Sequence, residues 1–229
     1  FIINVGFDGK GNTYVVATSS DGYRFFKLNS SNEISSAIDL PDNASEMLVS
    51  SRGDAYFYFS NYNRTIATVQ ADSKEIEIID QITNKLHLDL FYLDNDDNFF
   101  YSKEKGIYVI RPHSPTPVPI ANLEDFTSTL VNVAVTDKSG NIYLAVENKQ
   151  NYSIALITKD ALQEEKPYAT FINDPQLSTL LASEFKIDEQ NNLWVALNGF
   201  NQGVIKKLEG ANFKTVLTDT TWTYFNTVQ

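Results

Sequence analysis

Apolar and polar residues alternate in short runs along most of the chain, and polar turns interrupt these runs at regular intervals. Residues 188–196 show the unit: a strand end, a turn rich in Asp and Asn, and a second strand that opens on an aromatic residue. Further copies align at residues 8–14, 50–56, 94–100 and 137–143. This alternation predicts a β-strand on each side of every turn.

The copies recur with a nearly constant spacing. An Asn or Asp that precedes the second strand serves as the anchor of each copy, namely Asn12, Asp54, Asn98, Asn141 and Asn192, at intervals of 42, 44, 43 and 51 residues. A period near 43 with strand-turn-strand content is typical of four-stranded sheets in a radial array. The sequence therefore predicts an all-β fold, with residues 1–229 forming one β-propeller domain of five or six blades.

Each turn has a chemical explanation, and an aromatic residue follows it. Asp at the first position can accept a hydrogen bond from the backbone two residues on, and Gly or Asn near the end tolerates a positive φ. Two residues past each anchor stand Tyr14, Tyr56, Phe100, Tyr143 and Trp194. These rings either form stacking platforms for a planar ligand or fill the wedge between neighbouring blades.

Four segments depart from the repeat. Residues 111–119 hold four of the seven prolines, which indicates an outermost edge strand or a polyproline recognition segment. Short helices are expected at residues 159–166 and 174–181. Residues 222–228 predict one further strand, which either pairs with an N-terminal strand to close five blades or begins a sixth blade.

Composition narrows the possible partners. The net charge of −11 argues against nucleic acids and anionic membranes, because phosphate contacts need clustered Lys and Arg. The chain has no cysteine, which excludes thiol catalysis, disulfide bonds and zinc sites with Cys ligands. No apolar run approaches the ~18 residues of a membrane span, and residues 1–4 do not resemble a signal peptide. Glycosylation sequons begin at Asn29, Asn43, Asn63 and Asn151, where roughly three are expected by chance.

Catalytic and metal motifs find little support. His87 and His113 have no neighbouring pattern of a nucleophilic triad. The turn at Asp94 has EF-hand spacing in its first half, but Phe99 stands where the loop needs Gly and Lys105 where it needs Glu. We interpret this segment as a repeat turn with extra carboxylates.

Polar residues on the predicted inner strands point to a site at one mouth of the central channel. Asp89 and Asn132 fall at equivalent positions of adjacent repeats. Glu46 and Glu184 belong to two other repeats and lie at the next position of the inner strand. Such concave positions favour ligands. Asp89 and Asn132 offer oxygen ligands to a cation such as Ca²⁺, although polar residues at a wet channel mouth need no ligand.

Two family resemblances extend this interpretation. Residues 188–196 resemble the matching segment of the regucalcin and gluconolactonase family, which implies a divalent-metal lactonase or esterase, although Ser183 stands where that family has Asp. Residues 89–108 (DLFYLDNDDNFFYSKEKGIY) and 134–145 (AVTDKSGNIYLA) resemble the insect ommochrome-binding proteins. That resemblance implies a secreted haemolymph carrier of a planar, tryptophan-derived pigment.

The sequence thus favours a secreted, acidic, non-catalytic β-propeller that binds a small molecule at the channel mouth. The candidate ligand-binding residues are Glu46, Asp89, Phe91, Tyr92, Asn132, Glu184 and Phe185. The alternatives are a metal-dependent hydrolase of the regucalcin type and a propeller that binds other proteins without a small ligand. No metal ligand set or catalytic residue is assigned.

Overall fold

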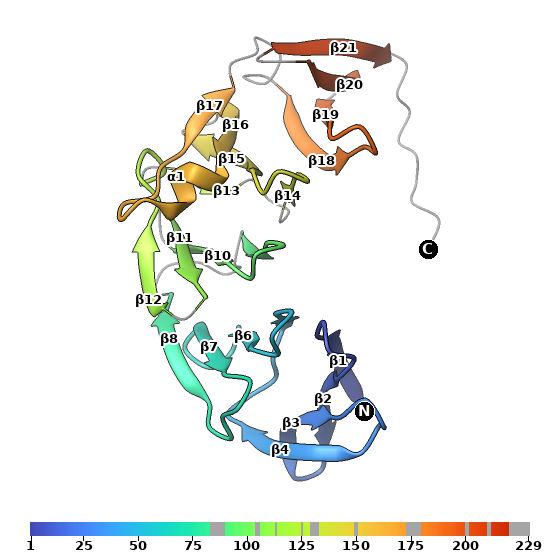
Figure 1. The fold of residues 1–229 in the computed structure, drawn as a ribbon, viewed down its shortest axis with the longest axis vertical. Helices are drawn as coiled ribbons and strands as arrows, with labels where there is room; N and C mark the ends of the chain where they lie inside the picture. The colour runs from blue at the N-terminus through green and yellow to red at the C-terminus, as the bar shows by residue number, and fades with distance from the viewer. Residues whose placement is uncertain are drawn as a thin grey trace. The chain divides into compact units, whose positions relative to one another are not determined.

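The computed structural model describes residues 1–82, 90–103, 106–112, 114–124, 126–128, 133–148, 151–172, 180–199, 202–209 and 212–219. Figure 1 shows that the described chain consists almost entirely of strands, with one short helix among them. The chain divides into two compact units, Phe1–Glu104 with Ile110–Pro117, and Lys105–Val109 with Val118–Gln229. A single domain over residues 1–229 stays a prediction.

Three antiparallel sheets account for the first half of the chain, and each has four strands. The first contains β1 (Ile2–Phe7), β2 (Thr13–Ser19), β3 (Gly22–Leu28) and β4 (Ile34–Leu40). The second contains β5 (Glu46–Val49), β6 (Ala55–Phe59), β7 (Thr65–Val69) and β8 (Glu77–Gln81). The third contains β9 (Phe91–Leu93), β10 (Phe99–Lys103), β11 (Gly106–Arg111) and β12 (Ser114–Pro119).

The second half contains two further sheets. One is formed by β13 (Thr127–Ser128), β14 (Ala134–Thr136), β15 (Ile142–Asn148), β16 (Asn151–Ile157) and β17 (Thr170–Ile172). Both β13 and β14 pair with β15, so together they take the place of one first strand. The last sheet contains β18 (Leu181–Ile187), β19 (Leu193–Gly199), β20 (Gln202–Glu209) and β21 (Asn212–Asp219). The five repeats predicted from the anchors are therefore five antiparallel sheets.

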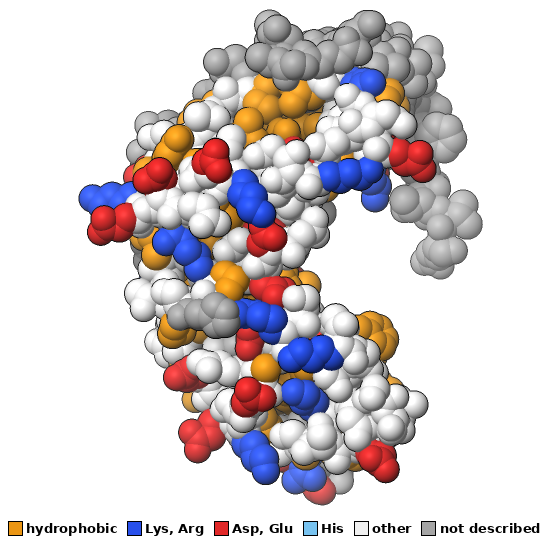
Figure 2. All heavy atoms as spheres, viewed as in Figure 1, with side chains coloured by type: hydrophobic (Ala, Val, Ile, Leu, Met, Phe, Trp, Pro, Cys, Tyr) orange, Lys and Arg blue, Asp and Glu red, His pale blue; other side chains and the backbone are white. Residues whose placement is uncertain are grey.

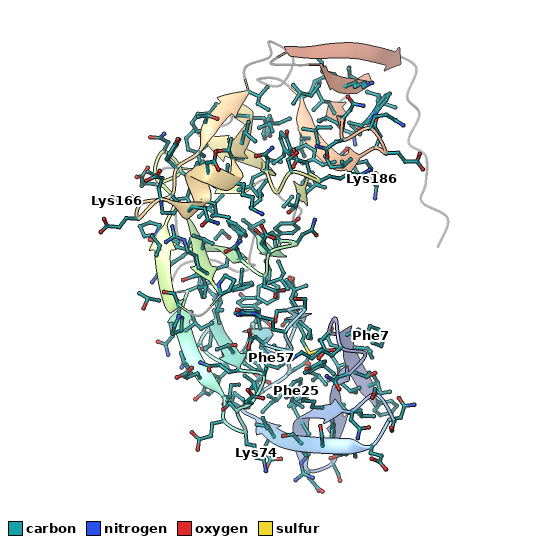
Figure 3. All side chains as sticks on the ribbon, in the orientation of Figure 1. Phe7, Phe25, Phe57, Lys74, Lys166 and Lys186 are labelled. Carbon is teal, nitrogen blue, oxygen red and sulfur yellow. The ribbon has the colours of Figure 1, made fainter. Side chains whose placement is uncertain are left out.

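Neighbouring sheets of the first unit pack face to face through aromatic residues. Every residue of β6 and β7 is buried, because the second sheet is covered on both faces. Phe25 and Phe57 pack edge-to-face with ring centroids 5.1 Å apart, and both are labelled in Figure 3. The opposite face of the first sheet is open, since Phe7 is 67% exposed. Burial of large rings between sheets is the main source of stability here.

The second unit has its own core. Tyr143 and Ala145 of β15 pack against Phe185 of β18 and Val195 of β19, in a cluster of buried aliphatic and aromatic residues. The first strands of the two sheets, β14 and β18, lie next to each other. In the first unit β1 lies next to β5, and β5 next to β9. The first strand of each repeat thus contacts that of the following repeat within a unit.

Two of the four predicted departures from the repeat are confirmed. The proline-rich segment contains β12, the outermost strand of its sheet, where a missing N–H costs no ladder hydrogen bond. Helix α1 (Lys159–Gln163) begins after Thr158, whose hydroxyl accepts from the backbone N–H of Ala161. The helix expected at 174–181 falls largely outside the described residues, and Leu181 opens β18. The strand expected at 222–228 lies outside them entirely.

The described helices do not include a membrane-spanning candidate: none combines the length and the apolar character that crossing a bilayer requires.

Candidate functional site

Five turns connect the first and second strands of the repeats, and each has seven positions. Turns 1 to 5 comprise residues 8–14, 50–56, 94–100, 137–143 and 188–194. In turns 1, 3, 4 and 5 the Asp at position 1 accepts hydrogen bonds from the backbone N–H groups of positions 3 and 5. Its second oxygen accepts from the Asn side chain at position 5, at 2.6 to 2.9 Å. The predicted Asx-turns are confirmed.

Position 4 of every turn has a positive φ. The angles are 80° at Gly11, 101° at Gly53, 65° at Asp97, 84° at Gly140 and 66° at Asn191. Gly takes this conformation without strain, and Asp and Asn tolerate it better than other residues. Gly or Asn was expected here from the sequence, and Asp97 adds a third residue type.

The aromatic residue at position 7 usually belongs to the turn as well as to the core. Tyr14 donates to the second oxygen of Asp8 at 3.0 Å, and the indole N–H of Trp194 donates to Asp188 at 2.8 Å. The Trp194 hydrogen bond, followed by those from Asn192 and Gln190, lowers the pKa of Asp188 to about 2. Tyr14, Tyr56, Phe100 and Tyr143 are all at least nine-tenths buried. This burial supports the wedge-filling interpretation over a ring of open stacking platforms.

Turn 2 departs from this arrangement. Ser50 stands at position 1 and Asp54 at position 5, so the carboxylate has moved to the other end of the turn. Ser50 Oγ accepts from the backbone N–H of Asp54 at 2.9 Å, which keeps the backbone turn intact. The two oxygens of Asp54 accept from the backbone N–H of Ala71 at 3.0 Å and from Arg52 Nη2 at 2.9 Å.

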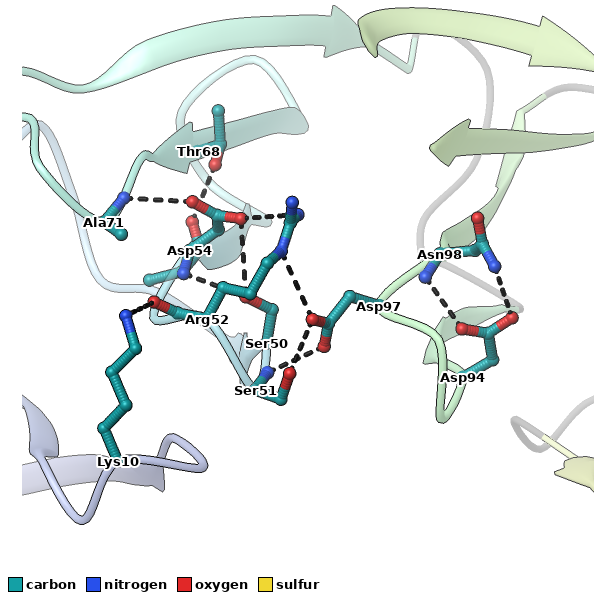
Figure 4. Close-up of polar contacts among 11 residues, drawn as sticks. Lys10, Ser50, Ser51, Arg52, Asp54, Thr68, Ala71, Asp94, Asp97 and Asn98 are labelled. Atoms are coloured by element: carbon teal, nitrogen blue, oxygen red, sulfur yellow. Dashed lines mark hydrogen bonds and ion pairs between the residues drawn. The ribbon is translucent and has the colours of Figure 1, made fainter. Parts of the chain in front are cut away.

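Neighbouring turns of the first unit are joined through Arg52 and Asp97. Asp97, at position 4 of turn 3, accepts from the Ser51 backbone N–H and hydroxyl, both at 2.7 Å. The guanidinium of Arg52 lies between Asp54 and Asp97, with Nε 3.3 Å from the Asp97 carboxylate (Figure 4). Lys10 Nζ of turn 1 reaches the Arg52 carbonyl at 3.5 Å. Arg52 is therefore held in place from two sides.

A cavity of about 700 Å³ opens beside turn 2, between the β5–β8 sheet and strands β11 and β12. Its apolar wall includes Tyr56, Ile79, Ile110 and Pro115. Its polar wall comprises Lys10, Arg52, Asp54, Thr68, Gln70, Asp72, Ser73, Arg111 and Ser114, and Ala71 completes the lining. The volume lies within the ~300–1,000 Å³ that is usual for a small-molecule site, and the lining is more polar than that of most such sites.

The charge of the cavity wall differs from that of the chain. Lys10, Arg52 and Arg111 contribute three positive charges, against Asp54 and Asp72. This leaves one positive charge in excess, in a chain whose net charge is −11. On the face that Figure 2 shows, Lys and Arg side chains are interspersed with Asp and Glu. Asp97, which pairs with Arg52 from outside the lining, offsets this excess, so the charges at the cavity are balanced on an acidic protein.

The sequence matches no protein-family model, and no curated relative was found. Solved structures are similar in fold. A catalytically inactive virginiamycin B lyase from Staphylococcus aureus with quinupristin gives a TM-score of 0.56 at 14% identity, over 93% of this chain and 69% of that one. YCF48 from Cyanidioschyzon merolae gives 0.57 at 12% identity, over 93% and 71%. Dipeptidyl peptidase 4 from Porphyromonas gingivalis gives 0.68 at 10% identity, over 96% and 40%.

These neighbours are β-propeller proteins. The chain has the β-propeller fold. At 10 to 14% identity the likeness concerns the fold alone, and the fold hosts unrelated functions. The resemblance to ommochrome-binding proteins stays a prediction.

The predicted ligand-binding residues of the first unit lie on β5 and β9, away from the cavity lining. Glu46 is half-buried on β5, and burial raises the pKa of its carboxyl. Phe91 is 3% exposed and packs edge-to-face on Phe99. Tyr92 is partly buried, with its ring centroid 6.3 Å from that of Phe100. The structure places Phe91 in the core, and contact of these three residues with a ligand stays a prediction.

The remaining predicted residues are divided between the second unit and the undescribed segments. Phe185 is a core residue of β18, whereas Glu184 is exposed and lies 3.4 Å from Lys186 in an ion pair. Asp89 and Asn132, the proposed cation ligands, lie outside the described residues. Within the part of the chain that is described, three or more His, Cys, Asp or Glu residues nowhere gather as a metal-binding group.

Sequence reasoning missed Arg52 and Arg111 as site residues, and took Tyr56 only as one ring among five. The signal that could have found them is the exchange in turn 2, where Ser and Asp replace the Asp and Asn of the other turns. An exchange of this kind marks the repeat that departs from the common structure. The cavity lies at that repeat.

Proposed function

We propose that this chain is a binding module that holds a small molecule in the cavity beside turn 2. The observation that carries the proposal is the cavity itself: about 700 Å³, lined by polar and charged side chains together with Tyr56, Ile79, Ile110 and Pro115. Arg52 is fixed there by Asp54 and Asp97, so a ligand meets a guanidinium that is already ordered. Ordered polar groups lower the entropic cost of binding.

The more specific form of the proposal is a secreted carrier without catalytic activity. It draws on the resemblance of residues 89–108 and 134–145 to ommochrome carriers, which favours a planar aromatic ligand. Ile79, Ile110 and Pro115 offer apolar surface in the cavity wall to such a ligand.

The first experiment is an ultraviolet-visible spectrum of protein purified from its natural source, with mass spectrometry of the molecules that denaturation releases. We expect one small molecule in stoichiometric amount, and a visible band if the ligand is a pigment. The matched variant is Ile110→Trp, which fills the cavity from an apolar lining position, and Ile38→Trp serves as the control at a buried position outside the lining. Purified variant protein that still carries the full amount of ligand contradicts the proposed site.

A further inference from the structure

Turn 2 contains a hydrogen-bond donor whose counterparts in turns 1 and 5 have an acceptor within their own turn. At position 7, Tyr14 donates to Asp8 and Trp194 donates to Asp188. Tyr56 occupies the same position, but Ser50 replaces the Asp, and the Tyr56 hydroxyl makes no hydrogen bond with any residue that the structure describes. Tyr56 is only 5% exposed and lines the cavity. The hydroxyl of Tyr56 is therefore available to an acceptor on a molecule bound in the cavity.

The charges around this donor narrow the acceptor. Arg52 shares the cavity wall with Tyr56, and the wall also contains the cations Lys10 and Arg111 and the carboxylates Asp54 and Asp72. Hydrogen bonds from cationic side chains to a carboxylate are stronger than those to a neutral acceptor. A second comparison agrees: in turns 1 and 5 the group that accepts from the aromatic side chain is a carboxylate.

We infer that the cavity binds the carboxylate of a small organic acid, which accepts a hydrogen bond from Tyr56 Oη beside the guanidinium of Arg52. The ligand carboxylate takes the role that Asp8 and Asp188 have in their own turns. The inference rests on the proposed function and specifies the class of ligand. It predicts that an acid binds more tightly than its uncharged amide, because hydrogen bonds to charged groups are stronger than those between neutral groups.

The test uses the full chain, labelled with ¹⁵N, and a fragment library of matched pairs. Each carboxylate is accompanied by its primary amide, with naphthalene-2-carboxylate and naphthalene-2-carboxamide as the reference pair, and inorganic phosphate forms a separate arm. Binding at the cavity is monitored through the backbone amides of Ala71, Asp72 and Ser73, which line it. We expect the acids to bind roughly tenfold to a hundredfold more tightly than the amides.

Two variants separate the hydroxyl from the ring. Tyr56→Phe keeps the stacking with Phe99, whose ring centroid lies 4.3 Å away, and removes only the donor. Tyr14→Phe removes the hydroxyl at the same position of turn 1, outside the cavity lining. We expect Tyr56→Phe to weaken acid binding roughly tenfold or more and amide binding several-fold less, because the bond to a charged acceptor is the stronger one. Tyr14→Phe should change neither, and circular dichroism verifies that both variants are folded.

The outcomes distinguish this inference from the proposed function. Equal affinity for acids and amides, or acid binding that is unchanged in Tyr56→Phe, overturns the carboxylate assignment and leaves small-molecule binding in place. Binding of phosphate but not of the acids assigns the site to a phosphate group instead. If no fragment of either kind perturbs the cavity amides at millimolar concentration, both the inference and the proposed function fail.

Discussion

Turn 5 and turn 2 have the same place in their repeats but use their carboxylates differently. In turn 5, Asp188 at position 1 accepts from Asn192 and Trp194, so the turn and its aromatic residue satisfy each other. In turn 2 the carboxylate is Asp54 at position 5, which accepts from Ala71 and Arg52. The backbone turn needs only one oxygen at position 1, and Ser50 Oγ supplies it. With its carboxylate at position 5, turn 2 keeps the backbone turn, and Asp54 pairs with Arg52. Tyr56 then has no carboxylate acceptor at position 1 of its own turn.

The largest effect on stability is expected when position 1 loses its carboxylate in a regular turn. Asp137 is 4% exposed and accepts from the N–H groups of Ser139 and Asn141 and from the Asn141 side chain. Asp137→Ala leaves these donors unsatisfied, and we expect the free energy of unfolding to fall by about 3 kcal/mol in urea denaturation.

Ser50→Ala is the matched variant in turn 2. Ser50 Oγ accepts only one strong hydrogen bond there, from the Asp54 backbone, so a loss of about 1 kcal/mol is expected. Equal losses in the two variants would show that the carboxylate at position 1 contributes nothing beyond a single acceptor.

The glycines at position 4 of turns 1 and 2 differ in how closely other atoms surround them. A methyl group on Gly53 would overlap the Tyr14 hydroxyl, whereas the nearest atom to one on Gly11 is the Ser30 Cβ at 4.0 Å. Both glycines have positive φ, so both substitutions strain the backbone. We expect Gly11→Ala to cost about 1 kcal/mol and Gly53→Ala about 3 kcal/mol, because only the second adds an overlap.

A double variant decides whether the extra cost at Gly53 comes from that overlap. Tyr14→Phe removes the hydroxyl that the new methyl group meets, so it should recover about 1 kcal/mol or more of the loss in Gly53→Ala. Thermal and urea unfolding of the single and double variants give the coupling. Strict additivity would assign the whole cost to backbone strain.

Exchanging the carboxylate back tests the comparison at the level of binding. Ser50→Asp with Asp54→Asn gives turn 2 the Asp and Asn of turns 1, 3, 4 and 5 at constant net charge. Asn keeps an oxygen for the Ala71 N–H, as Asn141 does for Lys159 at 3.2 Å. We expect stability to change by less than about 1 kcal/mol, while organic-acid binding weakens at least tenfold because Tyr56 gains an internal acceptor. Unchanged acid affinity in this folded variant would separate ligand binding from the turn.

The repeat, the sheets and the bonds within each turn could be predicted because each depends on residues close together in the sequence. Asp at position 1 and Asn at position 5 fix a local structure that repeats every 43 residues or so. The edge strand β12 followed from the chemistry of proline, and α1 from a helical pattern after Thr158.

The cavity could not be predicted in the same way, since its wall combines turn 1, turn 2, the β7–β8 connection and strands β11 and β12. The exchange between Ser50 and Asp54 is visible when the turns are aligned. The structural consequence of this exchange cannot be read from the alignment. Arg52 lies between Asp54 and Asp97, and Tyr56 lacks a hydrogen-bond partner among the described residues, only because of how adjacent sheets pack. Asp97 shows the same limit: its bond to Ser51 joins residues that are 46 positions apart.

The smallest expected effect concerns the titration of Asp188. Its hydrogen bond from Trp194, with those from Asn192 and Gln190, holds the pKa at about 2, below the usual 3.8. A lowered pKa in the folded state stabilises the fold above the unfolded pKa, and this contribution is lost as the pH falls through about 2. Trp194→Phe removes the indole donor and should move the pKa of Asp188 toward its usual value, as followed through the carboxyl ¹³C resonance. Asp8, whose donors belong to turn 1, provides the internal control and should titrate as before.

A pKa of Asp188 that stays near 2 in the variant would mean that the Asn192 and Gln190 donors alone hold the carboxylate. In that case a regular turn would not need the hydrogen bond from its aromatic residue at position 7. The absence of that bond in turn 2 would then not lower the stability of the fold.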